Sequence, residues 1–122
     1  MAQLTQDEFP HYRDIWIVDL DPVIGAEIGK RRPALVVSRD ENNQYASTVT
    51  VLPITSAPAK RDYLDEVTVP MGVGGLSRKS RIKANMMRTL SKSRLVRPLG
   101  NLPEQYEVPI NEAIRIHLNM PP

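Results

Sequence analysis

Two side chains suited to contacting a phosphate stand at the ends of neighbouring apolar runs. Arg32 comes directly before the run 33–38, and Thr55 comes directly after the run 48–54. Both runs are rich in β-branched residues, and the polar stretch 39–47 joins them, which predicts a hairpin with a long loop. In an antiparallel hairpin the start of the first strand faces the end of the second. We therefore expect the guanidinium and the hydroxyl to lie close together.

The register of this hairpin decides whether the two side chains meet. We pair Ser38 with Thr48, because these residues stand nearest the connecting stretch. Arg32 then falls opposite Ile54 or Thr55. A slip of one residue would turn every side chain to the other face of the sheet. The pattern therefore makes a specific prediction, which is one cation and one hydroxyl at the same sheet edge.

Charge is distributed unevenly, although the net charge is only +2. Residues 1–27 contain six acids and one base, and residues 28–39 contain four bases and no acid. Residues 67–103, the acid-free stretch, contain no Asp or Glu. Such a local positive field attracts polyanions and supplies phosphate contacts, so nucleic acid is the first partner to consider, although a solvated basic face would carry the same charges. The eight bases of the acid-free stretch are Arg78, Lys79, Arg81, Lys83, Arg88, Lys92, Arg94 and Arg97.

The other apolar and turn patterns predict short elements. In 80–86, apolar residues alternate with polar ones, so this strand is expected to have one apolar and one basic face. Pro109 suits the first residue of a C-terminal helix. Five or six short strands and one helix predict a mainly β fold, a small and strongly curved antiparallel barrel. The remaining expected elements are a strand at 14–20, a loop at 23–32, a short strand near 66–69, a glycine turn at 72–75 and a helical turn with a last strand within 91–100.

Length and composition indicate a single domain, residues 1–122, with 1–12 as a flexible N-terminal segment. The chain has no Cys, which excludes disulfides and a thiol nucleophile and fits a reducing cytoplasm. His11 and His117 stand far apart in the chain, so we expect no zinc and no other cofactor. His117 fits a packed, hydrogen-bonded side chain better than a catalyst. No apolar run reaches the roughly 18 residues of a membrane span, and we expect no export signal.

Seven short segments follow one another along this chain in an order that is typical of one protein family. They are Asp14–Pro22, Gly25–Glu27, Arg32–Ser38, Pro53–Ser56, Arg88–Leu90, Arg94–Leu95 and Asn111–Arg115. Together they resemble the MazF/PemK family of toxin ribonucleases over about residues 13–118. The resemblance implies an SH3-like antiparallel barrel of the MazF/CcdB/Kid type with a C-terminal helix. It also implies a homodimer that cuts single-stranded mRNA at a short sequence without a metal, together with a cognate antitoxin.

The resemblance assigns roles to individual residues. The Arg before the second strand's Pro and the Thr that closes the third strand are the family's catalytic pair, here Arg32 and Thr55. The family's mobile loop over the RNA corresponds to 23–31, and we expect Glu27 of this loop, or solvent, to act as the base. An acidic tail of the antitoxin would block the basic groove by occupying it. The expected RNA-binding residues are Ala26, Arg31, Ser56, Arg81, Lys83 and Asn85.

The chain departs from the family pattern at several positions. An Asn cannot act as a base, so Lys83 and Asn85 are expected to contact RNA only. Two other functions stay open, namely a CcdB-like toxin that traps DNA gyrase and a non-catalytic RNA-binding barrel. The pair of Arg32 and Thr55 argues against the gyrase toxin. The departures are Arg13 in place of Gly, Ile28 and Met86 in place of Gln, and Lys83 and Asn85 in place of the Arg and Asp of one family branch.

Overall fold

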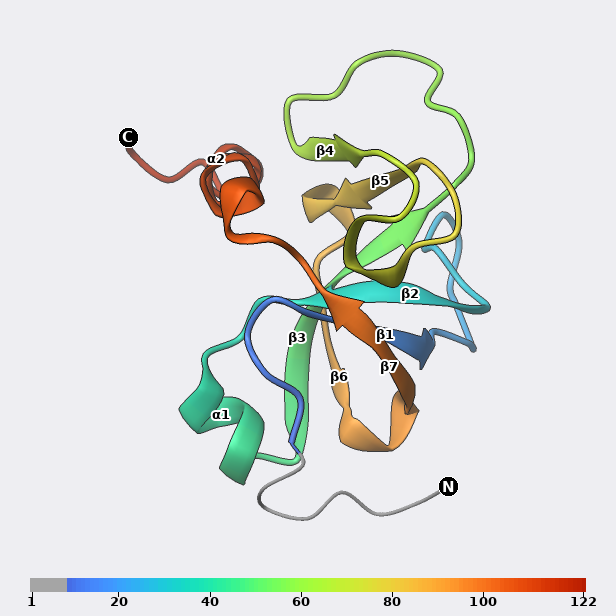
Figure 1. The fold of residues 1–122 in the computed structure, drawn as a ribbon, viewed down its shortest axis with the longest axis vertical. Helices are drawn as coiled ribbons and strands as arrows, with labels where there is room; N and C mark the ends of the chain where they lie inside the picture. Colours follow the sequence, from blue (N-terminus) through green and yellow to red (C-terminus); the bar gives the residue numbers. More distant parts are fainter. Residues whose placement is uncertain (1–8) are drawn as a thin grey trace.

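The computed structural model describes residues 9–122 as one curved antiparallel sheet with a C-terminal helix (Figure 1). Its strands follow the order β4-β5-β3-β2-β1-β7, and β6 pairs with the first half of β3. No helix in residues 9–122 is long and apolar enough to cross a membrane. The elements are β1 (Asp14–Asp19), β2 (Arg31–Val36), α1 (Asp40–Tyr45), β3 (Thr48–Thr55), β4 (Glu66–Val69), η2 (Val73–Gly75), β5 (Ser80–Lys83), η3 (Ala84–Met86), β6 (Arg88–Ser91), η4 (Lys92–Arg94), β7 (Leu95–Asn101), η5 (Glu104–Tyr106) and α2 (Glu107–His117).

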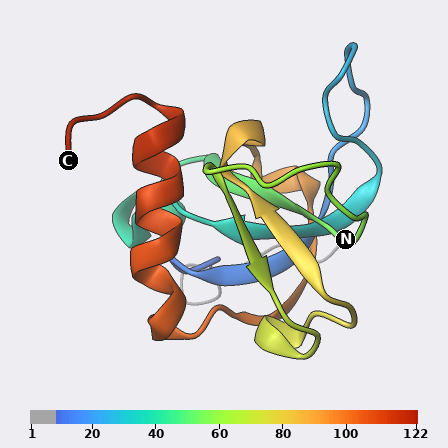
Figure 2. The ribbon, with the colours of Figure 1, turned by 90° about the horizontal axis from the view of Figure 1, so that it is seen from above.

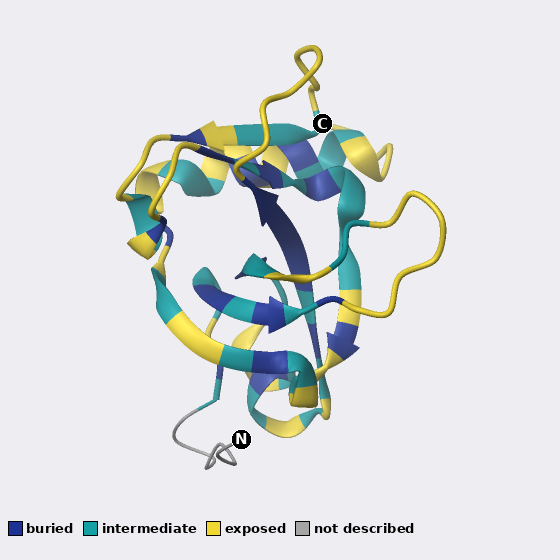
Figure 3. Ribbon diagram, turned by 90° about the vertical axis from the view of Figure 1, so that its right-hand side faces the viewer, coloured by how far each residue is buried: buried dark blue, intermediate teal, exposed yellow. Residues whose placement is uncertain are grey.

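The three strands β1, β2 and β3 are buried on both faces of the sheet. Their sequences are nearly continuous apolar runs, which is the pattern expected when neither face meets water. Successive residues therefore enter two separate cores, as Ile15 and Trp16 of β1 do. Figure 3 shows buried residues concentrated in the strands and exposed residues in the connections. The first core contains Ile15, Leu35, Leu52, Ile54, Val69, Leu76, Ile82, Ala84, Leu102, Ile110 and Ala113, and the second contains Trp16, Val18, Leu20, Ala34, Val36, Val49, Val51, Leu90 and Leu95.

The mainly β fold with a C-terminal helix is confirmed, but the described residues form seven strands rather than five or six, since β6 was not predicted. Helix α2 buries Ile110 and Ala113 in the first core and packs against β4 and η3. Figure 2 shows α2 beside the sheet, with the loop between β1 and β2 projecting away from it. The helix begins at Glu107, two residues before the predicted start. Pro109 fits within the first turn because the N–H groups there have no intrahelical acceptor.

Three local predictions were wrong. The stretch 39–47 contains α1, which Asn43 anchors by bonding to both the hydroxyl and the carbonyl of Ser38. The strand predicted at 80–86 ends at Lys83, because its partner β4 begins at Glu66. Residues 84–86 form the 3-10 turn η3 instead. The loop predicted at 23–32 is shorter, since β2 already includes residues 31 and 32.

The N-terminal segment falls partly outside the described residues. Of the predicted flexible segment 1–12, residues 1–8 are not described. The backbone N–H groups of His11 and Tyr12 donate to the carboxylates of Asp14 and Asp40, at 2.8 and 2.7 Å.

The predicted glycine turn packs directly on strand β7. Gly75 has a φ of +82°, and a Cβ there would lie 2.5 Å from the carbonyl oxygen of Leu99. Only a residue without a side chain allows this conformation and this approach together. The turn thereby fixes the segment that follows it, residues 76–80, against the sheet.

We predict that Gly75→Ala destabilises the protein by more than about 1–2 kcal/mol, because left-handed backbone strain adds to the steric overlap. Gly72→Ala is the matched control, since Gly72 has a φ of +95° but no atom within 4 Å of the point where a Cβ would lie. Urea unfolding of both variants measures the difference. Equal losses in the two variants would show that the contact with β7 has no energetic role.

Candidate active site

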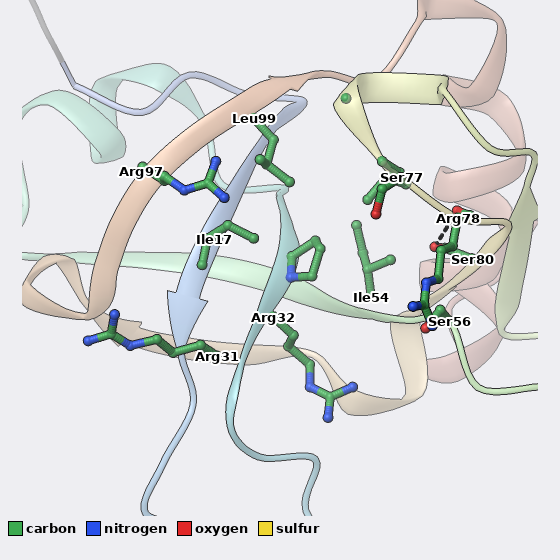
Figure 4. A pocket seen from close by; sticks show the side chains of 13 residues that line it. Ile17, Arg31, Arg32, Ile54, Ser56, Ser77, Arg78, Ser80, Arg97 and Leu99 are labelled. Atoms are coloured by element: carbon green, nitrogen blue, oxygen red, sulfur yellow. Dashed lines mark hydrogen bonds between the residues drawn. The ribbon is translucent and has the colours of Figure 1, made fainter.

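A pocket of about 490 Å³ opens where β1, β2 and β7 face the end of β3 and the segment 75–80. Its lining is part apolar and part polar, and its polar side chains are those of arginines and serines. Among the described residues that line it, none is acidic. In Figure 4, Arg31 and Arg97 project from one side and Arg78 from the opposite side. The lining residues are Ile17, Arg31, Arg32, Pro33, Ile54, Ser56, Gly75, Leu76, Ser77, Arg78, Ser80, Arg97 and Leu99.

The observed pairing of β2 with β3 ends two residues before Arg32 and Thr55. Strands β2 and β3 pair Ala34 with Pro53 and Val36 with Val51. The predicted pairing of Ser38 with Thr48 is wrong by one residue, because the observed register, continued past Val36, sets Ser38 opposite Val49. Continued in the other direction by two residues, it would set Arg32 opposite Thr55. Residues directly opposite in an antiparallel pair project from the same face of the sheet. In that extended register the two side chains would share a face, but Arg32 lines the pocket and Thr55 is not among the residues that line it.

The hydrogen bonds of this pair leave donors available. The Nε of Arg32 donates to the carbonyl of Gly29 at 2.7 Å, and within residues 9–122 its terminal Nη groups have no bonded acceptor. The Thr55 residue is only 8% exposed, and its hydroxyl oxygen accepts from the N–H of Ala57 at 3.2 Å. In that same part of the chain, the Thr55 hydroxyl hydrogen has no bonded acceptor. Both groups can therefore donate to an anion.

The loop between β1 and β2 carries Ala26 and Glu27 away from the pocket lining. Both residues are exposed, and Glu27 Oε1 accepts from the N–H of Ile24 at 2.6 Å.

Two arginines hold the base of the loop between β1 and β2. Arg88 donates to the carbonyl of Leu20 at 2.8 Å, and Arg94 donates to the carbonyls of Asp19 and Asp21. Arg88 thus supports the barrel, which is a structural role.

A buried carboxylate that the sequence patterns did not single out gathers three of the expected RNA-binding residues. The side chain of Glu66, on β4, is 4% exposed. It accepts from Arg81 at 2.5 Å and from Asn85 at 2.9 Å, and Lys83 Nζ lies 3.3 Å away. Burial alone would raise the pKa of Glu66, but the hydrogen bonds from Asn85 and Arg81 and the charges of Lys83 and Arg81 outweigh it and lower this pKa.

Sequence reasoning also missed two arginines of the pocket. Arg78 and Arg97 were noticed only as members of the acid-free stretch, yet the fold brings both to the lining with Arg31, Arg32 and Ser56. The signal available was the absence of acids, which does not show which bases the fold uses internally. Of the prediction that His117 is packed and hydrogen-bonded, the hydrogen bond is confirmed, since its Nδ1 lies 3.2 Å from Asp65 Oδ2, but the packing is wrong because the residue is exposed.

Fold and pocket together define a small antiparallel β protein suited to binding an anionic partner. The PemK-like, MazF-like toxin family of type II toxin-antitoxin systems matches residues 12–118. The chain belongs to this family.

Individual relatives agree with this assignment. Endoribonuclease MazF9 of Mycobacterium tuberculosis is 36% identical over 112 residues, which cover 88% of this chain and 94% of the relative. The crystal structure of MazF from Deinococcus radiodurans has a TM-score of 0.79 and 29% identity, covering 92% of this chain and 98% of that one. A MazE-MazF structure from the same organism has a TM-score of 0.73 and 30% identity, covering 93% and 98%.

We predict that the Glu66 cluster stabilises the protein in a pH-dependent way. Because folding lowers the pKa of Glu66, its stabilising contribution is complete above its ordinary value near 4.5 and is lost as the pH falls through the lower folded value. The difference in unfolding free energy between wild type and Glu66→Gln should therefore be on the order of 1–3 kcal/mol at pH 7 and shrink below about pH 4.5. Urea unfolding from pH 7 to pH 3 measures it.

Glu112→Gln serves as the control for this experiment. Glu112 also pairs with an arginine, Arg115, at 2.5 Å, but on the surface of α2. Surface pairs contribute little, so this variant should show no comparable difference. A Glu66→Gln difference that stays constant down to pH 3 would contradict the prediction.

Proposed function

We propose that this protein is the toxin of a type II toxin-antitoxin system and acts as a metal-independent endoribonuclease on single-stranded mRNA, thereby inhibiting translation and growth. One observation carries the proposal. In a chain of this toxin family, Arg32 lines an arginine-rich pocket that has no acid among its described lining residues, and the β2–β3 register, continued two residues past the pair of Ala34 and Pro53, supports Thr55 as its neighbour. The relative from Mycobacterium tuberculosis is named an endoribonuclease, which supports the same activity here.

The proposed reaction uses the nucleophile that RNA itself carries. The 2′-hydroxyl oxygen bonds to the adjacent phosphorus, and the bond from phosphorus to the 5′-oxygen breaks. The products are a 2′,3′-cyclic phosphate and a 5′-hydroxyl end. The protein must hold the chain in line, stabilise the charge on the phosphate oxygens and manage two protons.

Arg32 and Thr55 suit the electrostatic part of this reaction. A guanidinium presents paired donors in a fixed geometry that Lys cannot reproduce, and the terminal Nη groups of Arg32 are available for it. Thr55 donates its hydroxyl hydrogen to the same phosphate. Arg32 also supplies the proton to the leaving 5′-oxygen, and Glu27 or solvent removes the proton of the 2′-hydroxyl. Glu27 reaches the site only if its exposed loop closes over the RNA.

The remaining residues form two groups, those that line the pocket and those that contact the carboxylate of Glu66. Arg31 and Ser56 line the pocket, and we add Arg78 and Arg97 as phosphate contacts there. Ala26 contacts RNA from the loop. The residues that contact Glu66 also contact RNA, through the hydrogen-bond donors that Glu66 does not use. They are Arg81, Lys83 and Asn85.

We further propose a homodimer in the bacterial cytoplasm, neutralised by an antitoxin with an acidic tail. The family is defined by toxin-antitoxin systems, and the MazE-MazF structure shows a relative together with a second protein. An acidic segment would compete with RNA for the arginines of the pocket.

The decisive assay incubates the purified protein with mixed single-stranded RNA in EDTA and maps the new ends. We expect cuts at one short motif with 5′-hydroxyl ends. Binding without cleavage would indicate a non-catalytic RNA-binding barrel. Gyrase-dependent DNA breaks would indicate a CcdB-like toxin, and either result would overturn the proposal.

We predict that Arg32→Ala lowers the cleavage rate about 10²- to 10³-fold, because a charge-assisted donor to the reacting phosphate is lost. Its thermal melting should stay close to that of wild type. Arg39→Ala, which removes an exposed arginine beyond the opposite end of β2, is the control and should cleave normally. Near-normal cleavage by Arg32→Ala would show that the site is misplaced.

We predict that Arg97→Gln weakens RNA binding rather than the chemical step, because Arg97 lines the pocket as a phosphate contact. One phosphate contact fewer should reduce the slope of log K against log salt by about 0.7 for a single strand. Titrating a 2′-deoxy-substituted, non-cleavable RNA at several salt concentrations measures this slope. Arg39→Gln should leave it unchanged, and an unchanged slope for Arg97→Gln would remove Arg97 from the binding site.

A further inference from the structure

A chain of hydrogen bonds runs from the buried Glu66 to the hydroxyl of Thr55. Glu66 accepts from Nη1 of Arg81 at 2.5 Å. The Nε of the same Arg81 donates to the carbonyl of Ala57 at 3.0 Å. The N–H of Ala57 donates to Oγ1 of Thr55 at 3.2 Å. One arginine therefore connects an internal carboxylate to the turn that follows the candidate catalytic threonine.

Strand pairing shows that this chain lies on one side of the sheet. Thr55 of β3 pairs with Arg81 of β5, and Glu66 of β4 pairs with Lys83, two residues beyond Arg81. Opposite residues and residues two apart along a strand share a face, so all these side chains project from the same one. The side chains of Thr55, Arg81 and Glu66 therefore lie next to one another on this face, and the Arg81 side chain is only 14% exposed.

The hydrogen bonds from Glu66 to Thr55 also limit the directions in which the Thr55 hydroxyl can donate its hydrogen. A hydroxyl has one hydrogen and two acceptor positions. The Ala57 N–H occupies one acceptor position, which restricts the direction of the O–H bond. Arg81 fixes Ala57 through its carbonyl, and Glu66 fixes Arg81. Removing Glu66 would free Arg81 to leave the Ala57 carbonyl, and the turn 55–57 would lose its support.

We propose that Glu66 is a positioning residue for RNA cleavage, which acts through Arg81 and Ala57 to direct the Thr55 hydroxyl toward the scissile phosphate. The inference rests on the proposed ribonuclease function. Glu66 does not touch the RNA. Its effect should therefore appear in kcat and depend on the presence of the Thr55 hydroxyl.

The test is a double-mutant cycle on a defined RNA substrate, followed under steady-state conditions with the intact protein. We expect Glu66→Gln to lower kcat about 10-fold, whereas any change in KM reports the RNA contacts of Arg81, Lys83 and Asn85 that Glu66 also holds. In a Thr55→Val background, where no hydroxyl remains, Glu66→Gln should change kcat less than about twofold. A general loss of structure would lower kcat by the same factor in both backgrounds, and that result would overturn the inference.

Two further variants keep this test decisive. Asp65→Asn is the matched control, because Asp65 neighbours Glu66 and contacts Asn85 and His117 but stands outside the chain to Thr55. It should retain the kcat of wild type. If circular dichroism shows that Glu66→Gln is unfolded, Arg81→Lys replaces it in the cycle, since one ammonium cannot hold both Glu66 and the Ala57 carbonyl.

The possible outcomes separate this inference from the proposed function. Absence of cleavage by the wild-type protein would overturn both. Cleavage by wild type together with an unchanged kcat in Glu66→Gln would overturn the positioning role alone and leave the ribonuclease function standing.

Discussion

The burial of β1, β2 and β3 on both faces is the constraint on which the site depends. Neither face of these strands can carry an uncompensated polar side chain, so polar groups occur where the strands leave the two cores. Arg31 and Arg32 open β2, and Thr55 closes β3. Antiparallel pairing brings these two ends to the same edge of the sheet. The candidate site is thus a consequence of a sheet with two cores.

The basic residues of the acid-free stretch serve the fold as much as any ligand. Arg81 and Lys83 surround Glu66, and Arg88 and Arg94 bind backbone carbonyls at the base of the β1–β2 loop. Lys92 reaches the carbonyl of Gln44. Of the eight bases, Arg78, Lys79 and Arg97 have no bonded acceptor within residues 9–122. Two of these three line the pocket, where they add to the charge of Arg31 and Arg32.

How much the sequence could predict follows from the kind of signal each feature leaves. Apolar runs and the pairing rule predicted the pairing of β2 with β3, but they set its register one residue away from the observed one, because apolar runs alone do not fix where a pairing begins. Strand β5 ends early because its partner β4 begins at Glu66, which the sequence of β5 itself does not show. Helix α1 depends on the hydrogen bonds of Asn43 to Ser38, which no apolar pattern within residues 39–47 indicates. Glu66 looked like an ordinary strand acid, because only the fold shows that three donors converge on it.

Glu66 also shows how an acid is tolerated beside a site for a polyanion. An exposed carboxylate there would repel phosphates, yet Glu66 is almost completely buried and faces two cations, so the cluster keeps a net positive charge. Glu27 presents the opposite arrangement, a carboxylate on an exposed loop that bonds only its own backbone within the described residues. In the proposed reaction Glu27 or solvent removes a proton, and a carboxylate in that role needs access to the substrate, whereas one that holds other residues in place needs shielding. The fold therefore separates the two acids, keeping Glu66 inside the sheet and placing Glu27 on the loop.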